Sequence, residues 1–244
     1  MKFDIHCHLT SKEYESVKGV IEECERSSII MIANGLDYFD NEKVLELSRI
    51  YKNVYPSLGM HPTNNFDKKI INQIIKNRDE IVAIGEVGMD YKNGINNSQL
   101  INFQKLIKLS QELNKPLIVH SRSAEKEAIK ELANIKVPAV LHCFTGKKKL
   151  LKEAIINPNI YFSIPASIKY SEQFQELAKE VPINRLLCET DSPYLWKSGL
   201  NTPINVINSY EMIAQIKGLK LSDCEKTIQS TVKKVFKITE FKNN

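Results

Sequence analysis

The sequence predicts an α/β protein that folds as a (β/α)8 TIM barrel, with allowance for some distortion of the barrel. Short apolar runs alternate eight times with longer helical patterns. The repeat is about 25 residues long, close to what one βα unit of such a barrel needs. The chain has 244 residues, 42% of them hydrophobic, so we expect one large core in a single domain over residues 1–244. The alternative is an open, doubly wound sheet.

The expected strands are the short apolar runs. In order along the chain they are Phe3–His6, Ile29–Ala33, Val54–Leu58, Ile81–Gly85, Pro116–His120, Ala139–His142, Ile160–Ile164 and Arg185–Cys188. Apolar residues spaced by three and four, as in Val17, Val20, Ile21 and Cys24, predict the helices between them. These helices are Tyr14–Arg26, Glu42–Tyr51, Lys68–Asn77, Gln99–Leu113, Ala124–Leu132, Lys148–Ile155 and Ser171–Glu180, followed by Ile204–Lys217 and Asp223–Phe236.

Composition favours a cytoplasmic protein. No apolar run approaches the roughly 18 residues of a membrane span, and no secretory signal is visible. The five cysteines are odd in number and form no CxxC pair, which is typical of reduced thiols. Among them, Cys7 and Cys143 stand beside histidines, and strand alternation predicts that both point away and serve in packing. The net charge of +5 is compatible with a polyanionic substrate, and nothing indicates an obligate protein partner.

The pair His6 and His8 is the first candidate for chemistry. Residues two apart on a strand point to the same face, so both imidazoles project from the end of the first strand. In that geometry they can chelate one metal ion, whereas the alternative is two ordinary histidines in an N-terminal loop. All five histidines of the chain follow or end a predicted strand: His6, His8, His61, His120 and His142. The carboxyl ends of barrel strands share one rim, where active sites lie, so the sequence predicts a metal site there.

Two carboxylates complete this set. Glu86 is flanked by apolar residues in the fourth strand region, and an unpaired buried carboxylate is costly. It serves either as a metal ligand or as a partner of Arg122 or a helix cap. Asp191 follows the eighth strand, next to the first in a closed barrel, which favours a ligand over the cap of a turn at Ser192-Pro193.

These residues identify a resemblance to the TatD family of metal-dependent hydrolases, within the amidohydrolase-like barrel superfamily. The resemblance covers nearly the whole chain and depends on six motifs in order. They are Asp4-Ile5-His6-Cys7-His8, Gly59-Met60-His61-Pro62, Ile84-Gly85-Glu86-Val87-Gly88-Met89-Asp90-Tyr91, Pro116-Leu117-Ile118-Val119-His120-Ser121-Arg122, His142-Cys143-Phe144-Thr145-Gly146 and Glu189-Thr190-Asp191-Ser192-Pro193-Tyr194-Leu195. The chain departs from the family pattern at Leu200, where an arginine is usual, and at Ser230, where an asparagine is common.

The resemblance implies a distorted TIM barrel with one or two divalent cations, such as Mg, Mn or Zn. It implies that His6, His8 and Asp191 bind one cation, that His120 and His142 bind the second, and that Glu86 bridges them. His61 and Arg122 match positions associated with substrate phosphate. Two close cations can bind a phosphate oxygen and activate water, and Asp191 is then placed to act as a general base. Imidazole with carboxylate suits Zn or Mn more naturally than Mg.

The function that the resemblance implies is a deoxyribonuclease, of exonuclease type, that cleaves phosphodiester bonds of DNA by metal-activated water. One alternative is an esterase or deacylase of the same superfamily, acting for example on misacylated tRNA. Many amidases of the superfamily bridge their metals with a carbamylated lysine, and Glu86 at that place disfavours an amidase. The other alternative is an inactive nucleic-acid-binding homologue, which an intact set of ligand-type residues argues against.

Overall fold

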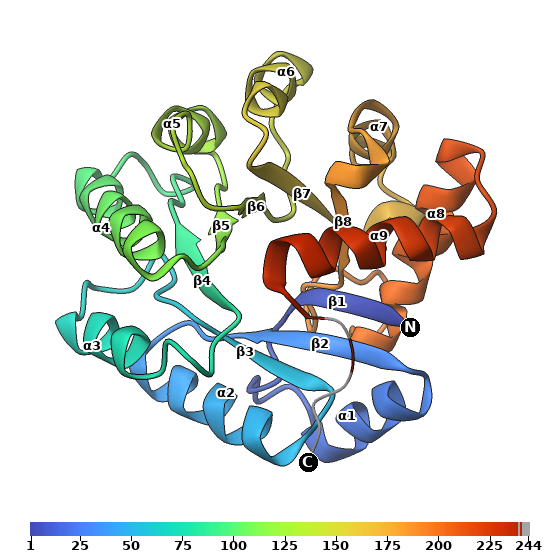
Figure 1. Ribbon diagram of the computed structural model, residues 1–244, viewed down its shortest axis with the longest axis horizontal. Helices are drawn as coiled ribbons and strands as arrows, with labels where there is room; N and C mark the ends of the chain where they lie inside the picture. The colour runs from blue at the N-terminus through green and yellow to red at the C-terminus, as the bar shows by residue number, and fades with distance from the viewer. Residues whose placement is uncertain (239, 241–244) are drawn as a thin grey trace.

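The computed structural model of the protein describes residues 1–238 and 240. In this part of the chain, eight parallel strands follow one another in the order β1 to β8 and alternate with helices on the outside (Figure 1). The predicted TIM barrel is therefore confirmed, and the open doubly wound sheet is excluded. The strands are β1 (Lys2–Cys7), β2 (Ile29–Asn34), β3 (Val54–Leu58), β4 (Ala83–Gly88), β5 (Leu117–His120), β6 (Ala139–Leu141), β7 (Ile160–Pro165) and β8 (Leu186–Glu189).

Helices follow the strands as expected, with different starts where polar side chains cap them. The helix expected over Tyr14–Arg26 begins after Ser16, whose hydroxyl accepts a backbone N–H of the first turn. The second helix begins at Tyr38 because Asp37 caps it in the same way. The α-helices are α1 (Val17–Arg26), α2 (Tyr38–Ile50), α3 (Lys68–Lys76), α4 (Asn97–Leu113), α5 (Glu125–Glu131), α6 (Lys148–Ile156), α7 (Glu172–Glu180), α8 (Val206–Lys217) and α9 (Leu221–Phe236), with 3-10 turns η1 (Ala166–Lys169), η2 (Ile183–Arg185) and η3 (Pro203–Asn205).

The fourth strand differs from the prediction in a way that matters for the site. It was expected over Ile81–Gly85, but it begins at Ala83 and continues to Gly88. Glycine usually weakens a strand, but here Gly88 lets two backbones approach, since a Cβ on it would lie 2.0 Å from the carbonyl oxygen of His120. Glu86 therefore lies within a strand, in a rigid part of the barrel, and not after it.

The barrel closes irregularly between β1 and β8. Within the described strands these two share no regular ladder, and an isolated bridge joins Cys7 of β1 to Ser192, three residues after the end of β8. The buried carboxylate of Asp4 accepts hydrogen bonds from the backbone N–H and the hydroxyl of Thr190, at 3.0 and 2.5 Å. The N–H of Asp191 donates to the carbonyl oxygen of His6 at 2.9 Å. This seam is the distortion that the resemblance implied, and it joins the segments that carry His6 and Asp191.

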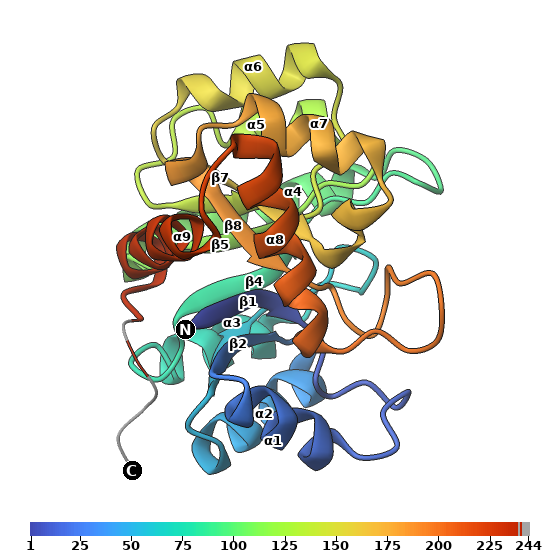
Figure 2. The same ribbon diagram turned by 90° about the vertical axis from the view of Figure 1, so that its right-hand side faces the viewer.

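The two ends of the barrel are different. Helix α9 lies across the end at which the strands begin, together with the N-terminus, and Lys2 pairs there with Glu225 at 2.9 Å (Figure 2). The loop between β8 and α8 extends from the opposite end, where the strands finish (Figure 2). This second end is therefore the open one. None of the helices in residues 1–238 and 240 is long and apolar enough to span a bilayer.

Candidate metal centre

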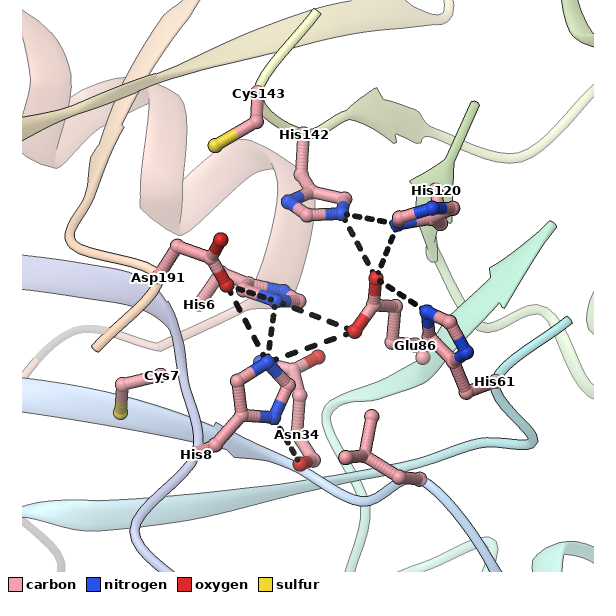
Figure 3. A network of polar contacts seen from close by, with 12 residues as sticks. His6, Cys7, His8, Asn34, His61, Glu86, His120, His142, Cys143 and Asp191 are labelled. Atoms are coloured by element: carbon pink, nitrogen blue, oxygen red, sulfur yellow. Dashed lines mark hydrogen bonds and ion pairs between the residues drawn. The ribbon is translucent and has the colours of Figure 1, made fainter. Parts of the chain in front are cut away.

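The carboxyl ends of the strands bring one cluster of imidazoles and carboxylates together (Figure 3). His6 is fully buried, and Glu86 and His8 are only 3% and 4% exposed, so these polar groups have left water at a considerable cost. Only partners of opposite charge or a bound cation offset that cost. The structure gathers seven of the eight residues that the sequence singled out: His6, His8, His61, Glu86, His120, His142 and Asp191.

One half of the cluster consists of His6, His8, Asp191 and one oxygen of Glu86. The Nε2 atoms of the two histidines lie 3.2 Å apart. Each lies 3.4 Å from Oδ1 of Asp191, and they lie 3.5 and 3.6 Å from Oε2 of Glu86. Donor atoms at about 2.0–2.2 Å from a tetrahedral cation are separated by about 3.3–3.6 Å. The two Nε2 atoms therefore have the spacing of ligands around a single ion, both with Oδ1 of Asp191 and with Oε2 of Glu86.

The other half of the cluster surrounds the second oxygen of Glu86. Oε1 lies 2.7 Å from Nδ1 of His120 and 2.9 Å from Nε2 of His142, and these two nitrogens are 3.3 Å apart. Nε2 of His61 lies farther away, at 3.8 Å. Figure 3 shows Glu86 between the two halves, with one oxygen toward each. The alternative in which Glu86 pairs with Arg122 is excluded, because its partners in the structure are histidines.

The charges of the cluster show that it attracts positive charge. Burial alone would raise the pKa of Glu86, but the nearby His142 and His6 hold that pKa well below its usual range. Burial would likewise raise the pKa of Asp191, and hydrogen bonds from His6 and His8 lower it instead. Burial would lower the pKa of His142, yet Glu86 raises it well above its ordinary value. The carboxylates therefore stay ionised and create a field in which a proton or a metal cation is stabilised.

Two imidazoles of the cluster, those of His8 and His120, each contact an oxygen atom through the ring nitrogen that does not face Glu86. Nδ1 of His8 lies 3.2 Å from the carbonyl oxygen of Asn34, and Nε2 of His120 lies 3.0 Å from Oδ2 of Asp90. Such contacts fix the tautomer of a histidine, so that its other nitrogen can face a cation. Sequence analysis missed both partners. The available signal for Asp90 was its place just after the fourth strand, in the same motif as Glu86.

Glu189, at the end of β8, is a third residue whose role was not predicted from the sequence. It is fully buried, and its Oε1 accepts the backbone N–H of Cys143 at 2.8 Å and the thiol at 3.1 Å. Its Oε2 faces Nδ1 of His142 at 3.7 Å. His6, His142 and Glu189 also form a group in which one ligand-type atom of each residue lies within 4.8 Å of the others. Oε2 of Glu189, Nδ1 of His142 and Nδ1 of His6 are all buried and form no hydrogen bond in the described part of the chain, so Glu189 lies beside one imidazole from each half of the cluster.

The prediction for Cys7 and Cys143 holds for the first but is incomplete for the second. Cys7 is fully buried in the core. β6 ends at Leu141, so strand alternation does not apply to Cys143, which adopts a left-handed φ of 44°. Its thiol contacts Glu189, and its side chain borders the recess above the metal-type ligands.

The two residues expected to bind phosphate lie at the edge of the cluster. His61 follows β3 in a loop, and its Nδ1 contacts the hydroxyl of Thr63 at 2.7 Å. Burial lowers the pKa of His61 to about 4, although Glu86 opposes this. Arg122 is exposed just after β5, and its guanidinium makes no hydrogen bond or ion pair with another described residue. Arg122 borders a recess of about 270 Å³. It also borders a larger recess of about 710 Å³, which His61 lines as well.

Comparison with known proteins agrees with this geometry. A family model described as TatD related DNase matches residues 3–237. The chain belongs to the TatD family. The family resemblance drawn from six sequence motifs is thereby confirmed, and so is the assignment to metal-dependent hydrolases.

The matches to individual relatives extend over almost the whole of this chain. A protein of Methanocaldococcus jannaschii, named as an uncharacterized metal-dependent hydrolase, is 36% identical over 242 residues and covers 96% of each chain. Human deoxyribonuclease TATDN3 is 33% identical over 255 residues, covering 94% of this chain and 93% of its own. The crystal structure of the TatD homologue YjjV from Escherichia coli is 19% identical, with a TM-score of 0.87 over 97% of this chain and 98% of the other. At that identity, YjjV shows that the fold is shared.

Proposed function

We propose that this protein is a divalent-metal-dependent phosphodiesterase that hydrolyses DNA, acting as an exonuclease. The main support for the proposal is the position of Glu86, whose two oxygens face two separate groups of histidines. A carboxylate in that position suits a pair of cations, because its negative charge offsets part of their mutual repulsion. The name of human deoxyribonuclease TATDN3 supports DNA as the substrate.

The donor set fits the proposed cations. In the proposal, His6, His8 and Asp191 hold one cation, His120 and His142 hold the other, and Glu86 contacts both. Imidazole with carboxylate suits Zn or Mn, and Mg is a weaker match. Such a pair of cations would bind a phosphate oxygen and lower the pKa of an attacking water.

The residues of the chain then act on the substrate and on the proton. Asp191 stays ionised, and its side chain is 15% exposed, so its carboxylate can accept the proton of the attacking water. Arg122 is exposed, and apart from a charge attraction to Asp90 its guanidinium makes no hydrogen bond or ion pair with another described residue, so it can bind a phosphate. His61 stands beside it on the rim and would donate to another phosphate oxygen. The net charge of +5 favours approach of a polyanion.

The expected location of the enzyme is the cytoplasm. All five cysteines are free: Cys7, Cys24, Cys143, Cys188 and Cys224. Free thiols persist in a reducing compartment such as the cytoplasm.

A substrate panel tests the proposal directly. The metal-loaded protein is incubated with single-stranded DNA, single-stranded RNA, a chromogenic carboxylic ester and a misacylated tRNA, with Mg, Mn or Zn added. We expect metal-dependent release of nucleotides from DNA. Cleavage of the carboxylic or aminoacyl ester with intact DNA would replace the proposal by an esterase or deacylase. Binding of DNA without any hydrolysis would replace it by an inactive homologue.

The variant His61→Ala separates substrate contact from metal binding. His61 lies within 4.8 Å of Glu86 and His120, but its Nε2 is 3.8 Å from Oε1 of Glu86, whereas His120 and His142 approach that oxygen to 2.7 and 2.9 Å. We therefore expect the protein to keep its full complement of metal. Loss of a single hydrogen bond to phosphate should lower kcat/KM for DNA by about tenfold. His61→Gln, which retains a donor, should recover part of the loss. Elemental analysis that shows a missing cation in His61→Ala would instead make His61 a ligand.

The variant Glu189→Gln tests whether the buried carboxylate orients the ligands. We expect weaker binding at both cation positions, by about 10–100-fold, because Glu189 faces Nδ1 of His142 and also lies close to His6, which belongs to the other position. Calorimetric titration of the metal-free protein measures both dissociation constants. Glu112→Gln, on the exposed face of α4, is the matched control and should leave both unchanged. Equal affinities in Glu189→Gln and the wild type would limit Glu189 to its contacts with Cys143.

A further inference from the structure

A recess of about 270 Å³ opens directly beside the metal-type ligands and has two unlike sides. We call His120, His142 and Asp191, which belong to the cluster, its floor, and the exposed Arg122 lines it as well. Phe174 of α7 and Leu195 of the loop between β8 and α8 form its apolar wall, and Ser121, Cys143 and Thr145 complete the lining. An apolar wall next to a catalytic floor is the arrangement of a binding site for the part of the substrate that flanks the reacting group.

Leu195 is held in an unusual conformation at this wall. Its φ of 61° is left-handed, which is rare for a bulky residue, and its side chain is 42% exposed. Cys143 and Asp191, which line the same recess, have φ values of 44° and 55°. Residues in sparsely populated conformations gather at functional sites, where the surrounding structure holds them in place.

Two hydrogen bonds from Asn201, which we call the brace, hold the loop that carries Leu195. The fully buried amide of Asn201 donates to the carbonyl oxygens of Thr190 and Tyr194, at 2.9 and 2.6 Å. The N–H of Tyr194 donates to the carbonyl oxygen of Asp191 at 2.9 Å. These bonds tie the segment before Leu195 to Asn201 behind it, and Leu195 remains exposed at the recess.

We propose that this recess binds the unpaired nucleobase next to the scissile phosphodiester, with Leu195 and Phe174 packing against the base. The inference rests on the proposed phosphodiesterase function and adds to it the group that flanks the reacting phosphate. A nucleobase has apolar faces that match the wall, and it is linked to a phosphate that Arg122 and the floor can hold. The recess is smaller than a site for a drug-sized ligand, so it receives one base separated from its partner strand.

Binding of two small anions tests the base contact without any hydrolysis. Thymidine 5′-monophosphate and 2-deoxyribose 5-phosphate share the sugar and the phosphate and differ by the base. We expect the metal-loaded wild type to bind the nucleotide at least about tenfold more tightly in calorimetry, as a packed base contributes. The preference should disappear in Leu195→Gly, which adopts the same backbone without the side chain, and in Leu195→Asn, which tolerates left-handed φ but is polar.

The control is Leu200→Gly in the same loop, because Leu200 is similarly exposed, at 41%, and does not line the recess. This variant should keep the preference for the nucleotide. The proposal is overturned if the wild type binds both anions equally, or if Leu195→Gly and Leu195→Asn keep the wild-type preference.

Hydrolysis separates this inference from the proposed function. Thymidine 5′-(p-nitrophenyl phosphate) and methyl p-nitrophenyl phosphate have the same leaving group, and the ratio of their kcat/KM values reports the nucleoside alone. We expect this ratio to fall by about tenfold in Leu195→Gly and to remain in Leu200→Gly. If the wild type hydrolyses neither ester with any metal, the phosphodiesterase function fails, while the binding comparison still decides whether the recess holds a base.

Discussion

Glu86→Gln is expected to reduce hydrolysis of DNA by at least about a hundredfold, which is typical when an electrostatic component of a site is lost. The glutamine has nearly the same shape but carries no charge. In the wild type, Oε2 faces His6 and His8, and Oε1 faces His120 and His142, at 2.7–3.6 Å. An amide offers one oxygen and one NH2 group, and the NH2 group cannot bind a cation.

The occupancy of the two cation positions should change unequally in Glu86→Gln. The position near His6 keeps three other ligands, His6, His8 and Asp191, whereas the position near His120 keeps only two imidazoles. We therefore expect the second cation to be lost first, which elemental analysis of dialysed protein measures. Glu112→Gln is the control for a change of charge on the surface. A Glu86→Gln protein with full metal content and near wild-type turnover would make Glu86 a structural carboxylate.

The double variant His6→Ala with His8→Ala should abolish hydrolysis and remove one cation per chain. Both Nε2 atoms belong to the same compact group, with Asp191 at 3.4 Å from each, so their loss leaves that position with carboxylate oxygens only. The fold should remain, because both substitutions leave the apolar residues of the barrel core unchanged. Circular dichroism and thermal unfolding check the fold, and elemental analysis checks the metal.

His61→Ala is the matched histidine control for that experiment, since it changes an imidazole on the same rim that we place outside the ligand set. Equal metal content in the double variant and the wild type would show that His6 and His8 are not ligands. Loss of the fold in the double variant, with His61→Ala intact, would assign a structural role to the pair.

Local patterns were enough to predict most of the barrel. Apolar runs and helical spacing gave eight strands in the correct order, because each βα unit folds mainly from its own stretch of sequence. The bounds of β4 were wrong, since the strand expected over Ile81–Gly85 runs from Ala83 to Gly88. In the structure Gly88 permits close contact with His120 of the neighbouring strand, which no local pattern reveals.

The side chains that face the centre of the rim were also predictable. Alternation placed His6 and His8 on one side of β1, and the shared rim of a barrel brought them near His120 and His142. The residues that support these histidines were not predictable, because their contacts join positions that are distant in the sequence. Asp4 joins β1 to Thr190, 186 residues later, and Asn34 reaches His8 through a backbone carbonyl that exists in every residue.

The left-handed conformation of Leu195 was likewise not predictable from the sequence. A leucine in a loop carries no local signal for positive φ, in contrast to glycine or asparagine. The conformation depends on the brace from Asn201, and hence on the packing of the loop against the completed barrel.

Metal reconstitution tests the central claim most directly. The protein is stripped with a chelator, and Mn or Zn is added back in steps while nucleotide release from single-stranded DNA is followed. The account predicts no release without metal, and recovery that reaches its plateau at two equivalents per chain, in line with the two groups of ligands around Glu86. Release that persists in the stripped protein, or DNA that stays intact at every metal concentration, would contradict a two-cation phosphodiesterase.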